Sequence, residues 1–428
     1  MIVQRLVFYT YNLLLSVLGL LYLPWFLVKL LVDSDGRQRR LERLAFGCST
    51  SGDIDVLLHG VSVGEVKAIR GLVDQMQRDY PDLKLAISTT TATGYQTAKS
   101  IYPDLDVLVY PLDMFGTCSR FLNVVSPGLV VLAELELWPN FLRACQARNI
   151  DVAVVNGRIT QRSLAGYLRI GRWLPRFGNV RFFGVQTELY SQRFEQLGVD
   201  PSDIVITGNI KFDSLHIPQA PGEDWPWSRW AKHNALLLAA STHSPEESQL
   251  LQAYSEIEFD NSVFVLVPRH PHRCEDLIIA LQRQVPQLKM ELFSRVSDSE
   301  QLDCDVLIVD ALGQLEQAFA HSDSSFIGGS LIEHGGQNLL EAAISDCPLV
   351  MGPSHHNFED EVELLLAHKG MHLANNAKNV LELMRDWQLN PDKADLLARN
   401  ARNALESQRG TAKITLAAMR DRCLLPLK

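Results

Sequence analysis

Short apolar runs separated by stretches of helical period are the feature that most constrains the fold of this chain. The first series comprises Asp55–Leu58, Lys84–Ser88, Val107–Tyr110, Leu129–Ala133, Val152–Val155 and Arg181–Gln186. Between them, stretches such as Val66–Arg78 and Gly94–Ile101 have the spacing of amphipathic helices. Continuous apolar runs are typical of strands buried on both faces. The pattern therefore predicts parallel strands joined by right-handed helical crossovers.

A second series of the same kind indicates a second domain. It comprises Leu236–Ala240, Val263–Val267, Val306–Val309, Ser325–Gly328 and Pro348–Met351. The intervening residues 216–234 are rich in Pro, Gly and Trp and have no clear period, which is typical of a linker. We expect an α/β fold of two doubly wound, Rossmann-like domains facing a cleft, with residues 34–215 in the first domain and 235–428 in the second.

The amino terminus carries a stretch of 23 residues without a charged side chain, from Leu6 to Val28. As a helix it is long enough to cross a bilayer core about 30 Å thick. Basic residues follow it (Lys29, Arg37, Arg39, Arg40 and Arg43), whereas only Arg5 precedes it, and no Ala-x-Ala cleavage site is present. We expect residues 1–33 to be a membrane anchor with the remaining chain on the cytoplasmic side. A buried core helix is the alternative, and the pattern does not distinguish a spanning helix from a shallow one.

The overall charge and the cysteines exclude several classes of protein. The formal net charge is -10 and the sequence pI is about 5.7, which disfavours a nucleic-acid partner. The seven cysteines are scattered and form no Cys-x-x-Cys pair, so neither a disulfide framework nor a zinc ribbon is expected.

Polar residues follow the predicted strands of the first domain. Glu65 ends the segment HGVSVGE and could be a general base or a first-turn glutamate that complements the helix dipole. Glu134 and Glu136 follow LVVLA and would project to one side if the strand continued. A functional pair is favoured, because burying two carboxylates is costly, but Glu134 could also bond backbone amides while Glu136 faces solvent.

Three basic residues of the first domain are weaker candidates. Arg158 and Arg162, in NGRITQRS, could bind an anion or be solvated surface residues. Lys211, in TGNIKFD, could reach into the cleft, although a lone lysine is usually solvated.

The second domain has a denser set of candidates. Ser241-Thr242-His243 and then Arg269 and His270 follow two predicted strands. The segment SFIGGSLIEHGGQNLLEAA reads as strand, two glycine turns and helix, in which glycines let the backbone approach a ligand and Glu341 could bond ribose hydroxyls. His355 and His356 lie near Glu359 and Asp360, but adjacent histidines point in different directions, so we assign no metal.

Taken together, these segments resemble the Kdo transferase family (3-deoxy-D-manno-oct-2-ulosonic acid transferases), glycosyltransferases of the two-domain GT-B fold. The match covers nearly the whole chain and follows the family's order through RQRRLERLAFG, HGVSVGE, ELELWPN, NGRITQRS, TGNIKFD, ASTHSPEE, VPRHP, DALGQL, GGSLIEHGGQNLLEAA and MGPSHHNFED. The resemblance implies inverting transfer of Kdo from CMP-Kdo to the lipid A precursor lipid IV(A), a tetraacyl disaccharide phosphate, at the cytoplasmic face of the inner membrane. It implies no cofactor, since CMP-Kdo is the donor substrate.

The resemblance also assigns roles to residues. It implies that the first domain binds the acceptor, that Glu65 is the catalytic base, and that Glu134 and Lys211 stabilise the transition state. The implied CMP-binding residues in the second domain are Arg269, His270, Leu312, Gly313, Gln314, Asn338, Leu339, Leu340 and Glu341.

This chain departs from the family pattern at a few positions. Gln337 and Leu339 stand where the family usually has His and Pro, Gln314 where it has an acid, and Asn156-Gly157-Arg158 where it has Asn-Ala-Arg. The alternatives are another lipid-directed GT-B transferase, an inactive sugar-nucleotide-binding or scaffold protein at the membrane, and a two-domain nucleotide-sugar epimerase. An epimerase would leave the apolar amino terminus unexplained.

Overall fold

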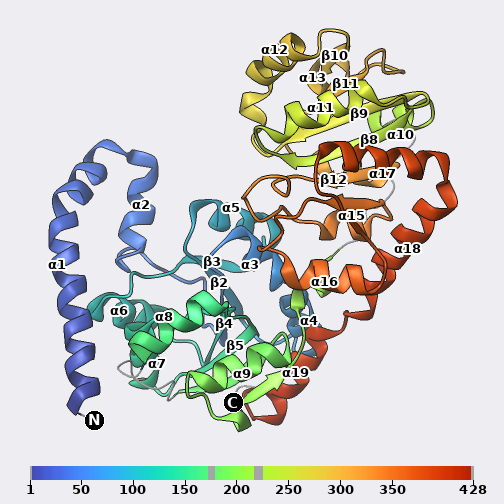
Figure 1. Cartoon of the computed structure of the whole chain (residues 1–428). Helices are drawn as coiled ribbons and strands as arrows, with labels where there is room; N and C mark the ends of the chain where they lie inside the picture. The colour runs from blue at the N-terminus through green and yellow to red at the C-terminus, as the bar shows by residue number, and fades with distance from the viewer. Residues whose placement is uncertain (1, 172–178, 216–224, 426–428) are drawn as a thin grey trace. The chain divides into compact units, whose positions relative to one another are not determined.

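The structure, a computed structural model, describes residues 2–171, 179–215 and 225–425 (Figure 1). Two compact units make up the chain. Unit 1 consists of residues 1–214 together with 408–428, and unit 2 of residues 215–407. The expected second domain extended to residue 428, whereas the structure groups the last residues with unit 1.

Unit 1 is built on a parallel sheet of 7 strands in the order β3-β2-β1-β4-β5-β6-β7. Its strands are β1 (Val56–His59), β2 (Leu85–Thr89), β3 (Asp106–Val109), β4 (Leu129–Ala133), β5 (Asp151–Gly157), β6 (Val180–Val185) and β7 (Ile204–Ile206). Its helices are α1 (Ile2–Val32), α2 (Ser34–Glu42), α3 (Val63–Ala68), α4 (Arg70–Asp79), α5 (Ala92–Ile101), α6 (Phe115–Val125), α7 (Pro139–Gln146), α8 (Gln161–Gly171), α9 (Glu188–Gln196), η1 (Pro201–Asp203), η2 (Ile210–Ser214) and α19 (Thr411–Asp421).

Unit 2 repeats this design with a parallel sheet of 7 strands in the order β10-β11-β9-β8-β12-β13-β14. Its strands are β8 (Ala235–Thr242), β9 (Ser262–Pro268), β10 (Met290–Leu292), β11 (Val306–Ile308), β12 (Ser324–Ile327), β13 (Leu349–Met351) and β14 (His372–Leu373). Its helices are α10 (Pro226–Ala231), α11 (Glu246–Glu256), η3 (Pro271–Arg273), α12 (Cys274–Gln284), α13 (Phe293–Val296), α14 (Leu315–His321), α15 (Leu340–Ile344), α16 (Glu359–Ala367), α17 (Ala377–Leu389) and α18 (Pro391–Ser407).

The central strands are buried on both faces, as the sequence predicts for parallel sheets. Successive residues of β1 pack into different cores: Val56 and Leu58 into one, and Leu57 into the other, with all three fully buried. This alternation follows from the period of two in a strand, whose side chains point to opposite faces. The expectation of two doubly wound α/β units is confirmed.

Part of the segment expected to be a linker is folded into unit 2. Its residues 216–224 lie outside the described part of the chain, but α10 follows directly. Trp227 and Trp230 in this helix are fully buried, and the Trp227 ring stacks on Phe293 with ring centroids 5.6 Å apart. A pair of buried indoles removes a large apolar area from water, which fixes the helix to the unit.

The apolar amino terminus forms α1, which lies beside α2 in unit 1 (Figure 1). Residues Phe8–Val32 are long and apolar enough to cross a membrane, with a mean hydropathy of 2.0, and their most apolar window is 0% buried. Near the start of the helix, Arg143 lies over the Phe8 ring and the Tyr11 hydroxyl donates to Asp113 Oδ2 at 2.8 Å. A buried core helix, the alternative considered from sequence, does not fit this exposure.

Candidate active site

The strand order of unit 1 reverses between β1 and β4, and the polar candidates of this unit lie at that position. In open parallel sheets, ligands bind beyond the carboxyl ends of the strands where the order reverses. β1 ends at His59, six residues before Glu65, and β4 ends at Ala133, directly before Glu134. The topology therefore brings these two carboxylates to the same edge of the sheet.

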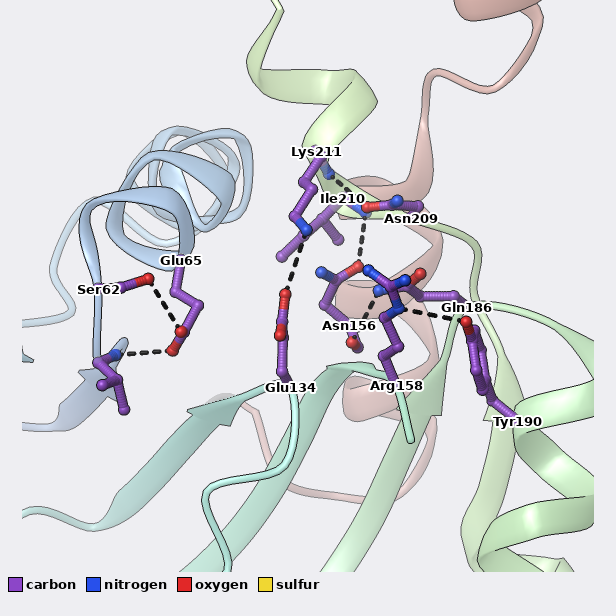
Figure 2. A network of polar contacts seen from close by, with 11 residues as sticks. Ser62, Glu65, Glu134, Asn156, Arg158, Gln186, Tyr190, Asn209, Ile210 and Lys211 are labelled. Carbon is purple, nitrogen blue, oxygen red and sulfur yellow. Dashed lines mark hydrogen bonds and ion pairs between the residues drawn. The ribbon is translucent and has the colours of Figure 1, made fainter. Parts of the chain in front are cut away.

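Glu65 lies in the first turn of α3 and folds back on the loop that precedes the helix (Figure 2). Its Oε2 accepts the Val61 N–H at 2.7 Å and its Oε1 accepts the Ser62 hydroxyl at 3.0 Å. Burial raises the pKa of Glu65 to about 7; the charges of Glu134 and Glu136 act in the same direction, and the two hydrogen bonds oppose them. A carboxyl group with a pKa near neutrality is suited to exchanging a proton with a substrate hydroxyl.

Glu134 follows the last residue of β4 and does not continue the strand. Its φ of 59° lies in the left-handed region, which is uncommon for residues other than glycine and is often found at functional sites. Its Oε1 lies 3.2 Å from Nζ of Lys211 (Figure 2). The structure thus pairs two of the residues that the sequence had only placed in the same domain.

Glu136 has a different partner from Glu134. Its Oε2 accepts the indole N–H of Trp138 at 2.6 Å, and burial raises its pKa. The two carboxylates would share a side only if the strand continued, and the strand ends at Ala133. Glu134 is therefore the one that contacts Lys211.

Asn156 supports the short helix that carries Lys211. Its side-chain Oδ1 accepts the Ile210 N–H at 3.1 Å, and its backbone carbonyl accepts from Gln186 at 3.1 Å (Figure 2). Asn156 is 1% exposed, and its φ of 55° is one that asparagine tolerates better than most residues. The sequence had placed Asn156 in a motif without predicting this contact.

The two arginines near this site have different environments. Arg158 is half-buried and donates from Nε to the Tyr190 hydroxyl at 3.2 Å (Figure 2). Arg162 lies exposed in the first turn of α8. Arg162 is therefore a solvated surface residue, one of the two alternatives considered from sequence. Arg158 instead bonds to Tyr190 close to Asn156 and Lys211 (Figure 2).

In unit 2 the strand order reverses between β8 and β12, and histidines gather there. The His243 ring lies 4.3 Å from that of His334 and 6.1 Å from that of His270, measured between centroids. Burial lowers the pKa of His243 to about 4, and the charges of His334 and His270 contribute. The ring is therefore neutral at pH 7, and its Nε2 lies 3.0 Å from Nε2 of Gln337.

Residues expected to contact CMP occupy three loops of unit 2. Arg269 and His270 are exposed just beyond β9, where the Arg269 N–H donates to the Thr242 carbonyl at 3.0 Å. Leu312 and Gly313 are also exposed, whereas Gln314 accepts the Trp227 indole N–H through Oε1 at 3.1 Å. This bond connects Gln314, the third residue of that loop expected to contact CMP, to α10.

The last of these segments begins α15. Asn338 is exposed; it donates to Glu341 Oε1 at 3.2 Å and accepts the Leu340 N–H at 3.1 Å. The side chains of Leu339 and Leu340 are buried at 0% and 4% exposure. Any contact that these two leucines make with a nucleotide therefore involves their backbone.

Comparison with known proteins identifies the family. The family model for 3-Deoxy-D-manno-octulosonic-acid transferase (kdotransferase) matches residues 38–214. The 3-deoxy-D-manno-octulosonic acid transferase of Haemophilus influenzae is 32% identical over 363 residues, which cover 83% of this chain and 84% of the relative. The chain belongs to the Kdo transferase family.

Two solved structures are similar to this chain. UDP-GlcNAc 2-epimerase from Neisseria meningitidis matches with a TM-score of 0.56 and 12% sequence identity, covering 87% of this chain and 100% of that one. The C-terminal CMP-Kdo binding domain of WaaA from Acinetobacter baumannii matches 41% of this chain and 91% of that domain, with 29% identity and a TM-score of 0.38. The epimerase likeness shows the two-unit α/β fold alone.

The family match includes Glu65, Glu134 and Lys211, the three residues that the geometry of unit 1 brings to one sheet edge. In unit 2, Gln337, one of the residues that departs from the family pattern, makes a polar contact with His243. Within residues 2–171, 179–215 and 225–425, no group of three or more His, Cys, Asp or Glu side chains could hold a metal ion.

The sequence did not single out Glu246, which is fully buried at the start of α11.

Proposed function

We propose that this Kdo transferase moves Kdo from CMP-Kdo to the lipid A precursor lipid IV(A), with inversion at the anomeric carbon. The observation that carries the proposal is the carboxyl group of Glu65, held at the reversal of the strand order with its pKa raised to about 7. Family membership supports the transfer of Kdo, and a single general base is what direct displacement requires.

The reaction that fits these residues is one displacement step. Glu65 takes the proton of an acceptor hydroxyl, and the oxygen of that hydroxyl bonds to the anomeric carbon of Kdo. The bond from that carbon to the phosphate oxygen of CMP breaks, and CMP leaves with the electron pair. Attack from the face opposite the leaving group inverts the anomeric carbon and needs no covalent intermediate.

The Lys211–Glu134 pair supplies charge for the transition state in this proposal. The two side chains are 26% and 28% exposed, so both remain accessible to a substrate. The Lys211 ammonium would stabilise the Kdo carboxylate or the departing phosphate, and Glu134 would stabilise the positive charge that develops on the sugar. Asn156 keeps Lys211 in place through its bond to Ile210.

Unit 2 would hold the CMP part of the donor. Arg269 and His270 offer exposed donors for its phosphate at the end of β9, and Asn338 and Glu341 offer polar atoms at the start of α15. The guanidinium of Arg269 matches phosphate geometry well. Gln314, which holds the Trp227 indole, would shape the loop that carries Leu312 and Gly313.

The same proposal includes anchoring to the inner membrane through α1, with the catalytic units on the cytoplasmic side. The exposed face of α1 carries apolar and aromatic side chains, including Leu21 at 74%, Tyr22 at 52% and Trp25 at 48% exposure. Aromatic residues of this kind favour the membrane interface. Anchoring would keep unit 1 next to a lipid acceptor.

The test is transfer by the purified full-length protein in detergent, with CMP-Kdo and lipid IV(A), followed by mass spectrometry. The wild type should add mass in Kdo steps, and Glu65→Gln should not. Glu188→Gln is the matched control, because Glu188 is an exposed first-turn glutamate of another helix in unit 1. Equal loss in both variants, or no product from folded wild type, would contradict the proposal and direct the search to other nucleotide sugars or to a scaffold role.

A further inference from the structure

Glu246 is a buried carboxylate to which the displacement step gives no role. It is the first residue of α11 and is 0% exposed. A buried carboxylate is costly unless hydrogen bonds or opposite charges compensate it. Its bonding partners therefore indicate why it is there.

Those partners are four backbone amides from two loops. Oε2 accepts the N–H of His243 at 3.0 Å and of Gly329 at 2.7 Å. Oε1 accepts the N–H of Ser330 at 3.0 Å and of Leu331 at 3.0 Å. The carboxylate thus joins the loop after β8 to the loop after β12, on the two strands between which the sheet order reverses.

Three of these four amides, those of Gly329, Ser330 and Leu331, belong to the glycine turn that the sequence suggested for ligand contact. Successive backbone N–H groups form a concave site for an anion. In this chain the anion is a side chain of the protein itself, so the donor phosphate has to be met by other groups. The role left for the turn is to carry the polar residues that follow it.

The turn after β12 is connected directly to those polar residues. The Gly329 carbonyl accepts the Gly336 N–H at 2.8 Å, which closes the loop from 329 to 336. Gly329 has a φ of 68°, and a Cβ built there would lie 3.1 Å from His334 Cδ2 and 3.5 Å from Gln337 Cγ. His334 and Gln337 are in turn the neighbours of His243.

We propose that Glu246 is a positioning residue that holds the loop 328–337 and the loop of His243 in the geometry that binds the donor. The inference rests on the proposed function, because it gives these loops a donor to bind. Glu246 acts only through the backbone it fixes, and Asn338 and Glu341 follow from that loop along the chain.

A glutamine at this position tests the mechanism most sharply. Glu246→Gln keeps the shape but replaces one accepting oxygen by an NH₂ group, which would face amide donors. The neighbouring Glu247→Gln is the matched control, since Glu247 is 1% exposed but its carboxylate pairs with the Arg273 side chain. Both variants remove a buried carboxylate, and only the first disturbs the loop.

Two measurements on the full-length protein in detergent give the answer. Hydrogen exchange should show loss of protection in residues 328–337 for Glu246→Gln and not for Glu247→Gln. The KM for CMP-Kdo should rise tenfold or more, with the KM for the lipid acceptor unchanged and kcat within threefold. Equal donor KM in Glu246→Gln and wild type, or a fall in kcat and Tm alone, would show a purely structural role.

A second variant keeps the test decisive if Glu246→Gln does not fold. Gly329→Ala strains the same turn, because the residue has a positive φ and an added Cβ would crowd His334, and it should raise the donor KM in the same way. Where both variants fold, their combined effect should be smaller than the product of the two, because both act through one loop. Unchanged donor KM in Gly329→Ala would overturn the proposal. A wild type that binds no CMP would refute the proposed function, whereas the exchange measurement still decides whether Glu246 holds the loop.

Discussion

The ammonium nitrogen of Lys211 lies 3.2 Å from Oε1 of Glu134, a residue whose backbone φ is 59°. Ion pairs with this degree of exposure stabilise proteins by about 0–1 kcal/mol. We therefore expect Lys211→Met to change the free energy of unfolding by less than about 1 kcal/mol, while transfer falls by about 10²-fold. Denaturant titration and single-turnover rates would measure the two effects.

The control for Lys211 is another ion pair of unit 1. Nε of Arg70 lies 3.8 Å from Oδ2 of Asp74, and the two side chains are 41% and 44% exposed. Arg70→Met should change neither stability nor transfer appreciably. Parallel losses of stability and activity in Lys211→Met would instead indicate that the pair is structural.

The pH dependence of transfer should follow the ionisation of Glu65. Because burial raises its pKa to about 7, the base is half protonated near neutrality, and kcat/KM should rise with pH to a plateau above about 8. Glu134→Gln removes a negative charge that raises this pKa, so the midpoint should move to lower pH. A midpoint below pH 5 in the wild type, or one that moves upward in Glu134→Gln, would contradict the assignment.

The same raised pKa predicts that stability falls as pH rises, whereas transfer increases. Between pH 4.5 and about 7 the folded protein binds more protons at Glu65 than the unfolded chain, so the free energy of unfolding contributed by this group falls as pH rises. Glu65→Gln has no such dependence. The free energy of unfolding of Glu65→Gln, relative to that of the wild type, should therefore be higher at pH 8 than at pH 5, while transfer is lost at both. Denaturation midpoints at the two pH values test this, and an identical difference at both would exclude it.

The last helix provides a prediction about stability alone. Leu416 in α19 is 3% exposed and belongs to the core formed with β1, α3 and α4, whereas Ile414 in the same helix is 52% exposed. Leu416→Ala should lower the free energy of unfolding of unit 1 by about 2–5 kcal/mol. Ile414→Ala should change it by about 0.5 kcal/mol or less. Chemical denaturation of both variants measures the difference, and similar values would mean that α19 is not part of that core.

The sequence predicted the central strands well but missed three of the four edge strands, with β3 the exception. All runs recognised from sequence correspond to strands within one or two residues, including Leu129–Ala133 as β4. The strands not predicted are β7, β10 and β14, which stand at the edges of their sheets. An edge strand needs only one neighbour and can be short; β14, for example, has two residues, both exposed. β7 and β10 have three residues each, and a run this short does not stand out in the sequence.

Residues that act locally were predictable, whereas contacts between distant segments were not. The position of Glu65 after β1 follows from the strand-turn-helix pattern alone. The contacts of Lys211 with Glu134 and of Ile210 with Asn156 depend on how β4, β5 and η2 meet, and Glu134 turns toward its partner through a left-handed backbone that the sequence does not signal. In the same way, the carboxylate of Glu246 reaches a turn more than eighty residues further along the chain.

The return of α19 to unit 1 has a consequence for the order in which the protein forms during synthesis. Residues 215–407 are contiguous, so unit 2 has its whole chain available as soon as residue 407 leaves the ribosome. Unit 1 begins first and is completed last, because Leu416 and Met419 belong to the same core as Val66 and Leu72. Until these residues emerge, unit 1 of the nascent chain carries an open apolar face, which is the kind of surface that chaperones recognise.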